Sequence, residues 1–373
     1  MNLKLLSKLL LVVILALMIT GSALVLSASS TYSALKFNHN SYYLFFSYLG
    51  KLPFALIGFV LFSKIPYTVY RRFSKKAIMV TAIVLFITAV LTVAVKGASR
   101  WISIGGLSFQ PSEIAKLVLL MHVAYLIESK GEGIKDFANG FKYPVIWIFV
   151  ISALVFVQPN VSTSIIIATI AFSVLFISGA KLKHIFATIG VAVGFAGVFA
   201  MIFNHSRERI LTFISSFGAL HKEINPQVAQ AKIALGSGGF RGIGLGQSRQ
   251  SDLFLPESYG DFIFSVLGEE LGYIGVISVL LIYMVIFIIG ILIAKNAKDQ
   301  YGQLLAFGIS FTIVLSAFIN AAVVTGLFPT TGITLPFISY GGTSLIFMCC
   351  SAGILTNIAL STYKEREVKK VTK

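Results

Sequence analysis

The sequence predicts an all-α polytopic membrane protein with ten transmembrane helices and a large extracytoplasmic loop between the seventh helix and the eighth. Of its 373 residues, 57% are hydrophobic and 12% are charged, and the mean hydropathy is +0.89. Soluble domains carry about a quarter charged residues, roughly twice this share. Because helices satisfy their own backbone hydrogen bonds in lipid, a chain of this composition is expected to cross the membrane as helices.

Ten apolar stretches approach the ~20 residues needed to cross about 30 Å of hydrocarbon. They lie near residues 9–28, 42–63, 77–95, 112–127, 143–157, 161–178, 185–203, 271–294, 303–326 and 337–360. The first resembles a cleaved signal, but its apolar core from Leu9 to Leu26 is longer than the usual ~7–15 residues. We interpret it as a retained helix and residues 1–373 as a single integral membrane domain.

The basic residues indicate the orientation of the chain. The net charge is +16, and with a cytoplasmic N-terminus most of the Lys and Arg residues fall on the inner side. The positive-inside rule therefore predicts that both termini are cytoplasmic. Membrane topology is the main explanation of these basic residues, and contact with anionic lipids is the second. Both explanations argue against a nucleic-acid partner. Cys349 and Cys350 are adjacent within the last helix, so no disulfide framework is expected.

Polar motifs gather on the outer side of the predicted topology. The largest is the loop over residues 204–260, hereafter the outer loop, and loops of this length are usually functional or disordered. Apolar residues within it make disorder the weaker interpretation. Shorter polar segments at 99–116, 158–163 and 325–342 join it on the same side. Because all four polar segments lie on the same side, we interpret them as a site that faces outward.

The first short segment reads SRWISIGGLSFQPSEIAK. Glu113 and Lys116 are three residues apart and lie on one face of a predicted helix. Two bare charges in lipid must pair or face a polar cavity. The sequence allows Glu113 and Lys116 to be either a structural ion pair or a substrate-binding pair. Arg100 and Trp101 are either an interfacial anchor or part of the site.

Within the outer loop, residues 236–250 read GSGGFRGIGLGQSRQ. Gly238 and Gly239 allow backbone N–H groups to converge on an anion, and the Arg241 guanidinium suits phosphate oxygens. No strand precedes these glycines and no βαβ unit follows, so a nucleotide-binding fold is excluded. The expected anion is the diphosphate of a lipid-linked substrate, and the alternative is a flexible turn.

The segment FPTTGITLPFISYGGTS covers residues 328–344. Pro329 and Pro336, together with three glycines, prevent a straight helix here. Irregular backbone near membrane depth is tolerated only when it is buried in protein or lines a wet cavity. A cavity lining that includes Ser339 and Tyr340 is favoured over a plain connection between helices.

Four acids stand at the start of the eighth apolar stretch, in the run ESYGDFIFSVLGEELG. A helix over residues 261–294 would measure about 51 Å, which exceeds the hydrocarbon by about 20 Å. We therefore expect a bend, for which Gly268, Gly272 and Gly275 are the candidate positions. Helix phase separates the acids, so one of Glu269 and Glu270 is expected to contact a cavity or partner and the other to be solvated. Asp261 is either a helix N-cap or a functional carboxylate.

In this order, and over nearly the whole chain, the motifs resemble the SEDS family (shape, elongation, division and sporulation proteins), which includes FtsW, RodA and SpoVE. The matching segments are RWISIGGLSFQPSEIAK, QPNVST, QAKIALGSGGFRGIGLGQSRQ, LPESYGDFIFSVLGEELGYIG and TTGITLPFISYGGTSL. The run GIGLGQSRQ is more similar to the FtsW and SpoVE branch than to RodA.

The resemblance implies a peptidoglycan glycosyltransferase for cell division, sporulation or cell shape. Such a protein polymerises lipid II at the outer face of the bacterial cytoplasmic membrane, with undecaprenyl diphosphate as leaving group. The implied partners are a class B penicillin-binding protein and other divisome or elongasome membrane proteins. Asp261 matches the family's catalytic aspartate, as a base or as a ligand of Mg²⁺ or Mn²⁺. Glu113 and Lys116 match a polar pair of the fourth helix, and Arg100 and Trp101 match an outer-loop pair.

One motif departs from the family pattern. The family usually reads QPD-x-GT, whereas this chain has QPNVST from Gln158 to Thr163, so Asn160 replaces an aspartate proposed to assist at the site. Asn160 brings no charge, which puts any site of two aspartates and a metal in doubt. Two other functions stay open: a lipid II flippase, against which the lack of a visible internal repeat argues, and a catalytically weak divisome scaffold, which Asn160 favours.

Overall fold

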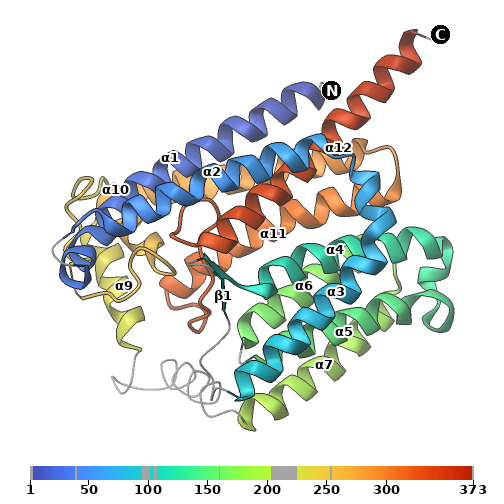
Figure 1. The fold of residues 1–373 in the computed structure, drawn as a ribbon, viewed down its shortest axis with the longest axis horizontal. Coiled ribbons are helices and arrows are strands. Elements are labelled where there is room, and N and C mark those ends of the chain that lie inside the picture. Colours follow the sequence, from blue (N-terminus) through green and yellow to red (C-terminus); the bar gives the residue numbers. More distant parts are fainter. Residues whose placement is uncertain are drawn as a thin grey trace.

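A computed structural model describes residues 3–37, 40–94, 101–104, 107–158, 160–202, 225–252 and 254–371 as a bundle of long helices (Figure 1). The elements are α1 (Leu3–Lys36), α2 (Tyr43–Lys64), α3 (Tyr67–Ala94), β1 (Ile102–Ile104), β2 (Leu107–Phe109), α4 (Pro111–Lys130), η1 (Gly131–Lys135), η2 (Phe137–Phe141), α5 (Lys142–Val157), α6 (Val161–Ile177), α7 (Leu182–Ile202), α9 (Pro226–Ser237), α10 (Ile263–Asn296), α11 (Gln300–Val324) and α12 (Gly342–Val371).

Each predicted apolar stretch coincides with a helix. Among the described residues, seven helices are long and apolar enough to cross a membrane: α1, α2, α3, α5 together with η2, α10, α11 and α12. The chain is therefore a multi-pass helical membrane protein. The last helix begins at Gly342, later than the predicted start at residue 337, because Ile338 and Ser339 donate backbone hydrogen bonds to Leu335 in a turn instead.

The helices form two groups that meet along α4 and α11. The first group contains α1, α2, α10, α11 and α12, and the second contains α3 to α7 (Figure 1). The N-terminal end of α1 and the C-terminal end of α12 lie at the same end of the bundle, and α9 lies at the other (Figure 1). We call the end with the termini the inner end and the end with α9 the outer end.

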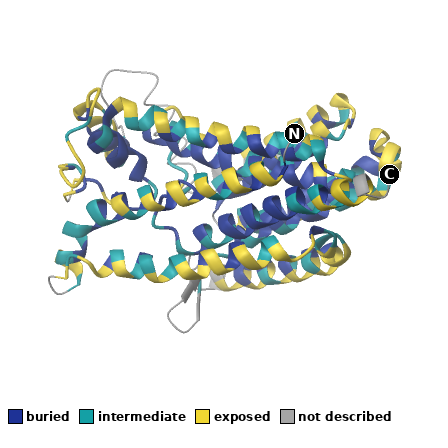
Figure 2. Cartoon of the chain, turned by 90° about the horizontal axis from the view of Figure 1, so that it is seen from above, coloured by how far each residue is buried: buried dark blue, intermediate teal, exposed yellow. Residues whose placement is uncertain are grey.

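Burial divides each helix into two faces (Figure 2). Dark-blue buried residues face the interior of the bundle, and yellow exposed residues cover its outside. The exposed residues include large apolar side chains such as Phe46 and Phe54 of α2 and Ile83 and Phe86 of α3. Such an apolar exterior suits contact with lipid tails.

Two elements of the outer end were not predicted. In α9, Pro226 occupies the first turn and the side chain of Asn225 accepts a hydrogen bond from the Gln227 N–H, which gives the helix a local start signal. A short antiparallel hairpin pairs β1 with β2, with Ile102 opposite Phe109. The hairpin contacts α12, where the Phe109 and Phe347 rings lie 5.9 Å apart.

The expected bend in the eighth apolar stretch is confirmed at Gly272. α10 is 34 residues long, and Gly272 inside it has φ 65° and ψ −167°. That positive φ lies in a region that only glycine adopts without strain. The bend separates an outer segment that begins at Ile263 from the long apolar segment that follows.

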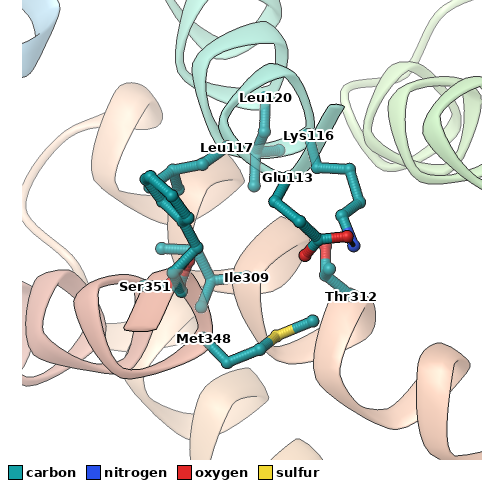
Figure 3. A pocket seen from close by; sticks show the side chains of 9 residues that line it. Glu113, Lys116, Leu117, Leu120, Ile309, Thr312, Met348 and Ser351 are labelled. Carbon is teal, nitrogen blue, oxygen red and sulfur yellow. Dashed lines mark hydrogen bonds and ion pairs between the residues drawn. The ribbon is translucent and has the colours of Figure 1, made fainter. Parts of the chain in front are cut away.

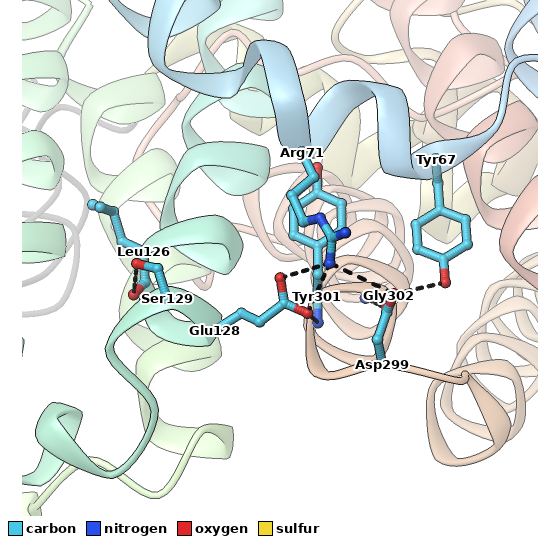
Figure 4. A network of polar contacts seen from close by, with 8 residues as sticks. All are labelled: Tyr67, Arg71, Leu126, Glu128, Ser129, Asp299, Tyr301 and Gly302. Carbon is cyan, nitrogen blue, oxygen red and sulfur yellow. Dashed lines mark hydrogen bonds and ion pairs between the residues drawn. The ribbon is translucent and has the colours of Figure 1, made fainter.

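The inner end is tied together by a polar network (Figure 4). Arg71 of α3 contacts Glu128 of α4 at 3.2 Å, and its distance to Asp299, just before α11, is 4.0 Å. Asp299 caps α11 by accepting from the Gly302 N–H at 2.8 Å, and it accepts from the Tyr67 hydroxyl at 3.1 Å. The network thus connects the two helix groups far from the outer polar motifs.

Candidate active site

Asp261 lies where the outer loop joins α10. The helix begins at Ile263 and its N-cap is Phe262, so the N-cap interpretation of Asp261 is wrong. The Asp261 side chain is half-buried, and its Oδ2 lies 3.5 Å from the position that a Cβ on Gly332 would take. The carboxylate therefore stands between the end of the outer loop and residues 325–341, which we call the site loop.

Asn320 of α11 holds these two segments together. Its Nδ2 donates to the carbonyl oxygens of Asp261 and Ile333, both at 2.7 Å. The side chain is 1% exposed. Sequence reasoning missed this residue, although a lone amide in an apolar helix is the kind of signal that marks a polar contact in membranes.

A group of tyrosines joins the same segments from the other side. The Tyr340 N–H donates to the Tyr259 carbonyl at 2.9 Å, and the two rings meet edge to face at 5.6 Å. Tyr32 of α1 packs against Tyr259 at 5.5 Å. Burial, with a smaller contribution from Glu257, raises the pKa of Tyr259 well above its usual range, so the phenol stays neutral. Ser339, which is buried, accepts from the Leu335 N–H at 2.8 Å and shapes the turn before Tyr340.

Glu113 and Lys116 form the expected pair (Figure 3). Glu113 Oε1 and Lys116 Nζ lie 2.8 Å apart, and the two side chains are 9% and 10% exposed. They line a small pocket with residues of α11 and α12, namely Ile309, Thr312, Phe347, Met348 and Ser351. Glu113 Oε2 is buried and, within the described chain, receives no hydrogen bond. The ion pair is confirmed, and its role toward a substrate stays a prediction.

The glycines of residues 236–250, which we call the glycine loop, allow the backbone to approach α10 closely. A Cβ on Gly238 would lie 2.0 Å from the Gly268 carbonyl oxygen, and a Cβ on Gly242 would lie 2.1 Å from that of Glu270. Side chains at these positions would clash with α10. Arg241 is exposed, and anion binding by Gly238, Gly239 and Arg241 stays a prediction.

The expectation for Glu269 and Glu270 is wrong, because both are 1% exposed and neither is solvated. Glu269 accepts from the Ser248 hydroxyl at 2.6 Å and from the Arg249 and Gln250 N–H groups at 3.2 and 3.3 Å. Glu270 accepts from the Ser27 hydroxyl of α1. Helix phase correctly separates the two side chains, but the glycine loop covers Glu269, and α1 together with the glycine loop covers Glu270. These carboxylates anchor structure.

The remaining predicted residues lie apart. Gln158 is buried and its Nε2 donates to the Leu85 carbonyl of α3 at 2.9 Å, while Asn160 precedes α6 and is 5% exposed. Trp101 is exposed beside β1. Arg100 lies outside the described residues.

A divalent cation at this site would have Asp261 as its ligand from the chain. In the part of the chain that the structure describes, no three His, Cys, Asp or Glu residues cluster as a metal site. Mg²⁺ is often held by one or two carboxylates and the phosphates of the substrate. Asp261 alone fits that arrangement, in which the substrate supplies the other oxygens.

Comparisons with known proteins agree with these features. The sequence model of the cell cycle protein family FtsW/RodA/SpoVE matches residues 7–364. The chain is 37% identical to a probable peptidoglycan glycosyltransferase FtsW of Geobacter sp. (strain M18), over 91% of this chain and 92% of that one. It is 35% identical to stage V sporulation protein E of Bacillus subtilis, over 94% and 96%. The fold matches RodA of Thermus thermophilus with a TM-score of 0.68 at 22% identity, covering 95% of this chain and 96% of that one.

Proposed function

This chain belongs to the FtsW, RodA and SpoVE family of cell cycle proteins, and from that premise we propose that it is a peptidoglycan glycosyltransferase that polymerises lipid II. One observation carries the proposal. The half-buried carboxylate of Asp261 stands at the outer end of the bundle, between two segments that Asn320 and Tyr340 hold together.

The proposed topology has ten transmembrane helices with both termini in the cytoplasm. α4, α6 and α7 join the seven apolar spans, and α4 with its 20 residues is about 30 Å long. The common position of the two termini supports an even number of crossings (Figure 1). The outer end then faces the outside of the cytoplasmic membrane, and residues 204–260 form the large extracytoplasmic loop.

In the proposed reaction, a sugar hydroxyl of one substrate attacks the anomeric carbon of another. A new carbon–oxygen bond forms there, and the bond to the diphosphate breaks, with its electron pair leaving on the diphosphate. Asp261 accepts the hydroxyl proton, because a positioned carboxylate is a suitable general base. In the alternative role, Asp261 and the substrate would hold Mg²⁺ or Mn²⁺, which would stabilise the charge of the leaving diphosphate.

The fold of the chain also matches a chain of a peptidoglycan synthase complex that coordinates polymerisation and crosslinking, with a TM-score of 0.77 at 22% identity. We infer that this protein works with a crosslinking partner of the class B penicillin-binding type. The proposed partner would bind at the outer end or along the apolar exterior of the helices.

The test is polymerisation of lipid II by the purified protein with its co-purified partner, in the presence of Mg²⁺ and after its removal with EDTA. Asp261→Ala should abolish glycan strands, whereas Glu257→Ala, which removes a nearby exposed acid, should leave them. Full polymerisation by Asp261→Ala would refute the assignment. Transbilayer movement of labelled lipid II without polymerisation would indicate a flippase instead.

A further inference from the structure

Lys51 is a charged residue inside an apolar span. α2 has 22 residues, and Lys51 lies eight residues after its first residue, Tyr43, or about 12 Å along the axis. The buried residues Leu44, Tyr48 and Ala55 form one stripe of this helix, and helical spacing places Lys51 in the same stripe. The lysine is half-buried and therefore directed at the bundle, away from lipid.

Among the residues that the structure describes, the surroundings of Lys51 are polar and include no counter-charge. Its Nζ lies 4.0 Å from the centroid of the Tyr340 ring, and the Tyr340 hydroxyl lies 2.9 Å from Ser47 Oγ, one turn before Lys51. A Cβ on Gly342 would lie 3.4 Å from the same Nζ. Within the described chain, Lys51 forms no ion pair with a carboxylate.

This arrangement differs from those of Lys116, whose side chain is 10% exposed, and Arg71, whose side chain is 40% exposed. Lys116 is paired with Glu113 at 2.8 Å, and Arg71 is paired with Glu128 at 3.2 Å. An aromatic ring attracts an ammonium group but carries no net charge. A lysine inside the membrane without an acidic partner costs folding free energy, so its presence indicates a functional site.

Lys51 also contacts a residue of the candidate active site, Tyr340. Its ring partner Tyr340 donates a backbone hydrogen bond to Tyr259, two residues before Asp261. Tyr340 thus separates Lys51 from the segment that carries the proposed base. A charge at this depth, in the outer half of the membrane, can be reached by an anionic group attached to a lipid chain.

We propose that Lys51 binds a phosphate of the polyisoprenoid diphosphate that carries the sugar, with the Tyr340 and Ser47 hydroxyls as neighbouring polar groups. This inference rests on the proposed function and adds a substrate-binding residue to it. In this role Lys51 stabilises the diphosphate before and after the glycosidic bond forms. A phospholipid headgroup offers the same phosphate chemistry, but only the diphosphate carrier has to lie beside Asp261.

The experiment measures binding of undecaprenyl diphosphate to the full chain in phosphatidylcholine nanodiscs, by ligand-induced thermal stabilisation and by direct titration. Lys51→Met should weaken binding about tenfold or more, because a charge-assisted contact is lost. Lys51→Arg should retain binding within about threefold. Lys36→Met is the matched control, because Lys36 also lies over a tyrosine, 5.2 Å from the Tyr32 ring, but at the exposed end of α1.

Without ligand, Lys51→Met should unfold at the same temperature as the wild type or higher, since no ion pair is broken. Lys51→Gln serves as the second uncharged variant if Lys51→Met does not fold. The proposal would be overturned if the uncharged variant that folds bound undecaprenyl diphosphate within twofold of the wild type. It would also be overturned if phosphatidylglycerol competed for the site as well as undecaprenyl diphosphate does. The assay requires no turnover, so a failure here leaves polymerisation by the wild type untouched, and an inactive wild type leaves the binding result interpretable.

Discussion

Replacing Asn320 with leucine tests whether the position of Asp261 depends on α11. Leucine keeps the approximate volume but removes the Nδ2 group that donates to Asp261 and Ile333 at 2.7 Å each. Two neutral hydrogen bonds contribute about 1 kcal/mol each, and each buried carbonyl left without a donor costs about 1–3 kcal/mol. Asn320 Oδ1 receives no hydrogen bond from the described residues, and its removal offsets part of that cost. We expect a loss of about 2–4 kcal/mol of stability.

The effect on catalysis should exceed the effect on folding. A misplacement of about 1 Å at a reacting group can lower the rate about 100-fold, so Asn320→Leu should lose most of its polymerisation per folded molecule. The assays are thermal unfolding in detergent and lipid II polymerisation normalised to monodisperse protein.

Asn357→Leu is the matched control for this prediction. Asn357 is a buried amide of α12 whose Nδ2 donates to the Ser63 carbonyl at 2.7 Å and whose Oδ1 accepts from the Tyr67 N–H at 2.9 Å, at the inner end. Its replacement should cost similar stability and leave the rate per folded molecule unchanged. Equal rates for the two variants, or a wild-type unfolding temperature for Asn320→Leu, would refute the reasoning.

Two further predictions concern the pocket and the glycine loop. Lys116→Met leaves Glu113 buried without its partner and should destabilise the protein by about 3–5 kcal/mol, measured by urea or thermal unfolding. The double variant with Glu113→Gln should recover most of that loss. A double variant as unstable as Lys116→Met would contradict this prediction. Gly238→Ala should lower the unfolding temperature, because its Cβ would meet the Gly268 carbonyl oxygen at 2.0 Å. Gly236→Ala should leave the unfolding temperature unchanged, because a Cβ there would have no atom within 4 Å. Equal unfolding temperatures for the two variants would count against the packing role of the glycine loop.

The helical membrane fold was predictable from apolar periodicity and length, and some local contacts near the candidate site from the spacing of residues. A bend at one of three glycines followed from a helix too long for the membrane, and the pair of Glu113 and Lys116 followed from spacing. The burial of Glu269 could not be predicted, because helix phase gives the direction of a side chain and not the segment that covers it. The glycine loop that covers Glu269 is placed by tertiary contacts, which no local pattern reports.

Asn320 and Lys51 were missed for a different reason. Each is a single polar residue in a stretch whose mean hydropathy is strongly apolar, so a search for apolar stretches does not single it out. The partners of both residues, Ile333 for one and Tyr340 for the other, lie in the site loop. That loop follows α11 and precedes α12, and its path over the ends of the helices is set by packing.

The contacts between the glycine loop and α10 also impose an order on biogenesis. Residues 236–250 leave the ribosome before α10, which carries the Glu269 carboxylate that accepts their hydrogen bonds. In the proposed orientation, the loop is translocated while its partner is still being synthesised. It can close only after α10 has been inserted with Gly272 near the outer boundary. The surroundings of Asp261 are therefore a late product of membrane insertion, and they are completed when α11 and α12 arrive with Asn320 and Tyr340.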